Sequence, residues 1–150
     1  MEDDYSRFFA DAEPRLRRAL VAHYGSERGR EAAAEALAYA WEHWPRIATM
    51  DRPLAYLFRV GQSRTRRFRL RTDVAFPAPV PVEMPWVEPG LPRALRSLSP
   101  RQRTAVVLVC GFGWSLREVG ELLGLKTTTV QNHVERGLAK LRLDLEVLDD

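Results

Sequence analysis

Five prolines within residues 73–90 constrain the fold of this chain more than any other feature of its sequence. The segment reads DVAFPAPVPVEMPWVEPG, with prolines at Pro77, Pro79, Pro81, Pro85 and Pro89. Because proline has no amide hydrogen to donate and fixes φ, this spacing permits neither a helix nor a central strand. We therefore expect a semi-extended linker over residues 73–90, between one domain at residues 1–72 and a second at residues 91–150.

The segment before the linker predicts three helices, at about residues 5–24, 27–44 and 53–71. Pro14 predicts a kink or a restart in the first helix, and Pro53 suits the first turn of the third. The second helix carries apolar residues at helical spacing, which predicts that they form one buried face. These residues are Ala33, Leu37, Ala40, Trp41 and Trp44.

The segment after the linker predicts four short helices, the first three at about residues 91–98, 99–110 and 115–123 and the fourth after Lys126. At the start of the second, Ser99 can cap the helix, Pro100 suits the first turn and Gln102 completes a capping box. These signals favour a helix although the run AVVLVC alone resembles a buried strand. Cys110, at the end of that run, is interpreted as a small buried residue. The predicted class is all-α, with a three-helix and a four-helix domain.

The spacing of the last two helices predicts a helix-turn-helix. The first of the pair starts with a second capping box at Ser115–Glu118 and stops at Gly124. In this motif the second helix reads base edges in the major groove. Since Val130, Val134 and Leu138 must face the core, the outward residues are Thr128, Thr129, Gln131, Asn132, Glu135 and Arg136. Arg117 and Lys126 are placed to contact phosphates. A helical hairpin whose polar face is only solvated is the alternative.

Positive charge is concentrated in the third helix. The chain has 21 Arg and 2 Lys, and seven of the Arg fall between Arg52 and Thr72, where there is no acid. Guanidinium groups that alternate with aromatic rings suit a single strand of DNA, whose phosphates and unpaired bases they can contact. The residues available for this contact are Arg52, Tyr56, Arg59, Gln62, Ser63, Arg66 and Arg67. A solvated basic face is the alternative.

Composition argues against several other classes. A single cysteine rules out an intramolecular disulfide, and the three histidines show no metal-ligand spacing. No glycine-rich phosphate loop is present, so we expect neither an enzyme nor a cofactor or metal. No apolar run reaches the roughly 18 residues of a membrane span, and the N-terminus is acidic, unlike that of a signal peptide. We expect a cytoplasmic protein without membrane insertion.

Several motifs in order resemble those of the small bacterial RNA polymerase sigma factors of the extracytoplasmic-function (ECF) group, in the sigma-70 family. Glu13-Pro14-Arg15-Leu16 is similar to the family's "YPRL". The segment from Arg52 to Val60 resembles "PRAWLYRVA", and those from Leu98 to Arg103 and from Ser115 to Gly124 resemble "LPPRQR" and "SYEEIAELLG".

The resemblance implies a transcription initiation factor. The second helix would dock on core RNA polymerase through Glu31, Glu35 and Tyr39. The third helix would hold the melted −10 strand of promoter DNA, and the helix-turn-helix would hold the −35 element. Partners that keep such factors inactive (anti-sigma factors) are common in the family.

Departures from the family pattern leave an alternative open. Ala34 stands where the family's docking helix usually has Gln, and Ser63 changes a motif in the third helix. The tripeptide Gln131-Asn132-His133 is closer to the "KNH" of LuxR-type regulators. The alternative is a sigma-like or LuxR-type regulator or interaction module that does not drive initiation itself.

Overall fold

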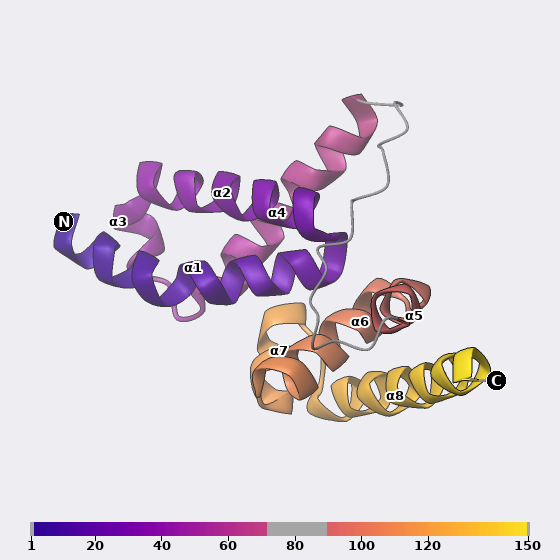
Figure 1. The fold of residues 1–150 in the computed structure, drawn as a ribbon. Coiled ribbons are helices and arrows are strands. Elements are labelled where there is room, and N and C mark those ends of the chain that lie inside the picture. Colours follow the sequence, from indigo (N-terminus) through magenta and orange to yellow (C-terminus); the bar gives the residue numbers. More distant parts are fainter. Residues whose placement is uncertain (1, 72–89, 150) are drawn as a thin grey trace.

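The structure, a computed structural model, describes residues 2–71 and 90–149, with side chains for residues 2–65 and 90–146. All the regular elements in these ranges are helical (Figure 1). The N-terminal half contains α1 (Glu2–Tyr24), α2 (Ser26–Glu42), α3 (Trp44–Ile47) and α4 (Pro53–Arg71). The C-terminal half contains α5 (Leu91–Ser97), α6 (Pro100–Val106), a π-helical turn η1 (Val107–Gly111), α7 (Leu116–Leu123) and α8 (Thr127–Asp149).

The predicted all-α class with two helical units is confirmed. The linker predicted over residues 73–90 lies outside the described residues except for Gly90, so the predicted domain boundaries stay predictions.

The N-terminal half is built on close contact between α1 and α2. Gly25 makes the turn between them with a φ of 96°, which glycine adopts without steric cost. Gly29 then lies so close to α1 that a Cβ there would overlap the backbone of Val21. The fully buried Leu16 and Leu20 of α1 meet a row of alanines on α2 and, from α4, Leu57 and Phe58. The small alanine side chains of α2 therefore allow α1, α2 and α4 to pack closely around one apolar core.

Two expectations for this half are corrected. α1 is one helix through Pro14, which excludes the predicted restart, while the predicted kink stays a prediction. Trp44 is buried as predicted, but Trp41 is 50% exposed and contacts the ring of Tyr5 edge-on at 4.9 Å. Tyr5 of α1 thus covers only part of Trp41, and the rest of the indole is exposed.

Helix starts in the C-terminal half follow the predicted caps. The Ser99 side chain accepts from the Gln102 amide and the Gln102 side chain accepts from the Ser99 amide, at 3.2 and 3.3 Å. The helix predicted to reach residue 110 instead changes to a π-helical turn after Val106. Within this turn Leu108 is buried and Cys110 is exposed, which corrects the predicted burial of Cys110.

The two halves pack against each other through α1 and α4 on one side and α6, η1 and α7 on the other (Figure 1). Leu20 and Leu108 belong to one continuous apolar core. Arg103 of α6 donates from Nε to the Ala22 carbonyl and from Nη2 to the His23 carbonyl, both at 2.6 Å. These carbonyls end α1, and an arginine there satisfies groups that have no partner within the helix. We call this packing the closed arrangement.

Candidate nucleic-acid interface

The helix-turn-helix of α7 and α8 is set by its cap and its turn. Ser115 and Glu118 form the predicted capping box at the start of α7. These bonds from Ser115, with the guanidinium of Arg15 beside the carboxylate, lower the pKa of Glu118. α7 ends at Gly124, whose φ of 70° turns the chain, and the Leu125 amide then donates to the Gly120 carbonyl at 2.9 Å. The motif is therefore formed by the residues that the sequence indicated.

The predicted reading face of α8 lies on the surface. Val130 is fully buried and Val134 is half-buried, which fixes the rotation of the helix. Thr129 is half-buried, and the exposed residues are Thr128, Gln131, Asn132, Glu135 and Arg136. Gln131 donates to Glu135 at 3.2 Å, so a base that bonds Gln131 must compete with this contact. Asn and Gln can pair with adenine and Arg with guanine, so this face is chemically able to read bases.

Two cations flank the reading face. Arg117 lies on α7, 84% exposed, with Nε 3.3 Å from the Glu121 carboxylate. Lys126 lies in the turn and is exposed. Their position beside the N-terminus of α8 suits phosphate contacts, as predicted from the sequence.

The predicted single-strand face of α4 is partly occupied by contacts within the chain. The Tyr56 hydroxyl accepts from Arg46 at 2.6 Å and lies 3.2 Å from the Tyr39 hydroxyl. The bond with Tyr39 is the main cause of a raised pKa at Tyr56. Of the other predicted residues, Arg52, Arg59 and Ser63 are exposed and Gln62 is half-buried. The side chains of Arg66 and Arg67 lie outside the described residues.

The structure brings together two sets of residues that the sequence analysis assigned to separate promoter elements. Arg52, Tyr56 and Arg59 line one side of an open groove, and Arg117 and Lys126 line the other. An Arg59 Nη2 atom lies only 3.9 Å from the position of a Cβ at Gly124. The basic face of α4 is thus turned toward the helix-turn-helix.

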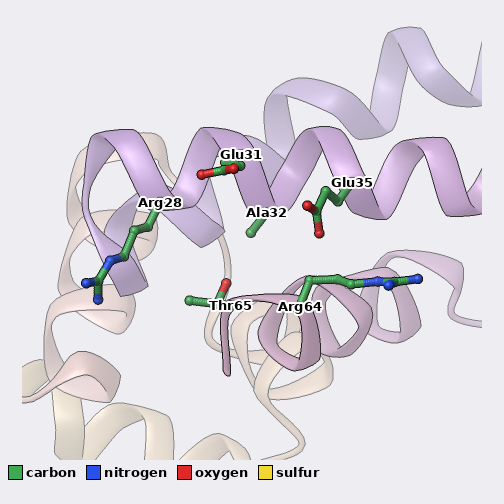
Figure 2. Close-up of a pocket in the computed structure, with 6 residues that line it drawn as sticks. All are labelled: Arg28, Glu31, Ala32, Glu35, Arg64 and Thr65. Atoms are coloured by element: carbon green, nitrogen blue, oxygen red, sulfur yellow. The ribbon is translucent and has the colours of Figure 1, made fainter. Parts of the chain in front are cut away.

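The outer face of α2 carries the residues predicted to dock on polymerase. Glu31 and Glu35 are exposed. Figure 2 shows both among the residues that line a pocket with Arg64 and Thr65. This pocket is a crevice between α2 and α4 of about 20 Å³, room for about one water molecule. Tyr39 is half-buried and stacks on His43, with ring centroids 4.1 Å apart. The sequence analysis did not predict that Trp41 is exposed, because its spacing matched that of the buried face.

Other classes of site find little support in the described part of the chain. Within residues 2–71 and 90–149, no three His, Cys, Asp or Glu side chains gather as metal ligands would. Nor does any helix in these ranges combine the length and apolar character needed to cross a membrane.

Comparison with known proteins gives three findings. Residues 90–141 match the family described as sigma-70, region 4. The chain is 36% identical over 93 residues to the RNA polymerase sigma factor CarQ of Myxococcus xanthus, an alignment that covers 57% of this chain and 53% of CarQ. The chain therefore spans about half the length of this curated relative. Its fold matches the sigma factor RpoE of Bartonella quintana, solved in complex with the anti-sigma factor NepR. That match has a TM-score of 0.72 and 20% identity, and covers 96% of this chain and 98% of the other.

Residues 90–141, which include the helix-turn-helix, are thus similar to sigma-70 region 4, and the whole chain shares its helical fold with a sigma factor. The resemblance to the ECF sigma factors that the sequence motifs predicted is thereby confirmed.

Proposed function

We propose that this chain is a bacterial transcription initiation factor that binds core RNA polymerase in the cytoplasm and directs it to specific promoters. The observation that carries the proposal is the exposed polar face of α8 on a sigma-70 region 4 domain. This face would read the −35 element, with Arg117 and Lys126 on the flanking phosphates. The protein acts by binding DNA and polymerase, not as an enzyme.

The polymerase contact is proposed for the outer face of α2. Glu31 and Glu35 supply exposed carboxylates beside α4, and Trp41, further along α2 and beside Tyr5 of α1, has half of its surface in water. Buried tryptophans contribute much of the binding energy at protein interfaces, and a half-exposed one supplies apolar area for a partner to cover. Trp41 therefore joins the two glutamates as a proposed contact.

The −10 contact is proposed for the basic face of α4, and it requires the closed arrangement to open. α4 and the helix-turn-helix face each other across one groove, so promoter DNA bound along either element would meet the other. The 18 residues of segment 73–90 could span at most roughly 60 Å, so its length permits the halves to separate. A partner that holds the halves together would inhibit the factor, and a sigma factor of the same fold has been solved with an anti-sigma factor. We propose that such a partner exists here.

Co-purification with core RNA polymerase tests the proposal. We expect the wild-type chain to bind in a 1:1 ratio, and Glu31→Ala with Glu35→Ala to weaken binding at least tenfold. The control, Asp4→Ala with Asp11→Ala, removes the same charge from exposed positions of α1 and should bind normally. A folded wild-type chain that does not bind polymerase would contradict the proposal and favour a regulator that does not drive initiation.

Promoter assays test the DNA contacts separately. Gln131→Ala should relax base preference in the −35 element, because the residue can pair with a base edge. Arg66→Ala with Arg67→Ala should reduce promoter opening more than duplex binding, because these arginines are assigned to the melted strand. An unchanged base preference, or an equal loss of opening and duplex binding, would remove the corresponding residues from the interface.

A further inference from the structure

The groove between α4 and the helix-turn-helix is lined mainly by cationic and small or apolar side chains. It has a volume of about 520 Å³ and lies where the two halves meet. Four cationic side chains line it: Arg52 and Arg59 from the N-terminal half, and Arg117 and Lys126 from the C-terminal half. The only carboxylate among the lining residues is Glu121.

The charges in this groove are not balanced within the chain. Glu121 serves two of the cations, with its carboxylate 3.3 Å from Arg117 and 3.8 Å from Arg52. The side chains of Arg59 and Lys126 have no hydrogen-bond or ion-pair partner within the described residues. Four cations and one carboxylate leave an excess of three positive charges. Like charges gathered in one groove repel, so an anion placed among them would stabilise the arrangement that gathers them.

The size and lining of the groove indicate what kind of anion it fits. Its volume falls in the range of about 300–1,000 Å³ that is typical of small-molecule sites. Guanidinium groups bind phosphate oxygens in pairs, which makes arginine well suited to polyphosphates. Tyr56, Ala55 and Leu125 add apolar surface beside the cations.

We propose that the groove binds a nucleoside polyphosphate, with its phosphates among the four cations and its base against the apolar lining. Because the lining comes from both halves, the complete site exists only in the closed arrangement. A bound polyphosphate would therefore hold α4 against the helix-turn-helix. This inference goes beyond the proposed function and does not depend on it, since its test uses neither polymerase nor promoter.

Calorimetric titration of the full chain with ATP and with sodium tripolyphosphate, at about 0.15 M salt, tests the proposal. We expect Arg59→Ala with Lys126→Ala to weaken ATP binding at least tenfold. The control, Arg30→Ala with Arg93→Ala, removes the same charge from exposed sites outside the groove and should weaken binding less than twofold. No binding of ATP up to millimolar concentration, or equal loss in the two variants, would overturn the proposal.

A second set of variants tests whether both halves are needed. Arg103→Met and the milder Arg15→Ala loosen the closed arrangement without touching the groove, since Arg15 pairs with Glu118 at 2.7 Å elsewhere in the interface. Both should weaken ATP binding at least threefold while far-UV circular dichroism shows the helices intact. If both variants bound ATP with the affinity of the wild-type chain, the site would lie on one half alone and the proposal would be overturned.

The choice of probes identifies the ligand. Tighter binding of ATP than of tripolyphosphate would support a nucleoside polyphosphate, because only ATP can use the apolar lining. Equal affinity for the two probes would overturn the assigned base contact. A 12-nucleotide oligothymidylate that binds in the groove more tightly than ATP would overturn the proposal in favour of a nucleic-acid strand.

Discussion

Arg103 is predicted to be the residue on which the closed arrangement depends most. Its guanidinium makes two bonds of 2.6 Å to the carbonyls that end α1, at Ala22 and His23. Hydrogen bonds from a charged donor contribute about 1.5–3 kcal/mol each. Burial of the guanidinium, which lowers the pKa of Arg103, offsets part of this gain. We therefore expect Arg103→Met, which keeps the apolar stem, to reduce the free energy of unfolding by about 2 kcal/mol.

Urea unfolding followed by circular dichroism measures this loss. For a urea dependence of about 2 kcal/mol per M, the midpoint should fall by roughly 1 M. The matched control is Arg101→Met on the same helix, where the side chain is exposed. Small-angle X-ray scattering without urea should show a larger radius of gyration for Arg103→Met alone. Equal midpoints and equal radii for the two variants would refute the assignment of Arg103 to the interface.

Two further predictions concern packing and pH. Gly29→Ala should destabilise the chain by about 2 kcal/mol or more in urea unfolding, because its Cβ would overlap the Val21 backbone. Gly111→Ala, which meets open space, should cost less than about 1 kcal/mol. Burial, aided by the charges of Arg103 and Arg101, lowers the pKa of His23 from 6.5 to about 4. The unfolded chain therefore binds more protons than the folded chain between pH 4 and pH 6.5. The contribution of neutral His23 to the free energy of unfolding is fully present above pH 6.5 and is lost as the pH falls toward 4. His23→Gln should remove about 1–2 kcal/mol of this loss, after allowance for partial solvent exposure, and an unchanged pH profile would refute the assignment.

Local signals predicted much of the fold. The capping boxes at Ser99 and Ser115 start helices at those residues, because each forms its bonds within a few positions along the chain. Gly124 ends α7 with a positive φ, which glycine adopts without steric cost, so this helix end too can be recognised from a single residue. The period of Val130 and Val134 then predicted which side chains of α8 face water.

What the sequence could not indicate depends on contacts between distant residues. Trp41 fits a buried helical face by spacing, but Tyr5 of α1 covers only part of its side chain. Cys110 is exposed because it lies on the side of its turn opposite the buried Leu108, which the unbroken apolar run around it does not indicate. The groove that joins Arg59 to Lys126 arises from packing between the halves, which periodicity within a helix does not encode.

The long sequence separation of the contacts between the halves has a consequence for synthesis. Arg15 and Glu118 are 103 residues apart, and Arg103 is 81 residues from Ala22. The contacts among α1, α2 and α4 lie within the first 71 residues, so they can form before the C-terminal half is made. At about 5–20 residues per second, the 47 residues from Arg71 to Glu118 take roughly 2–10 s to add. During that interval the end of α1 lacks its arginine partner, and the basic face of α4 is open to the nucleic acid of the ribosome itself.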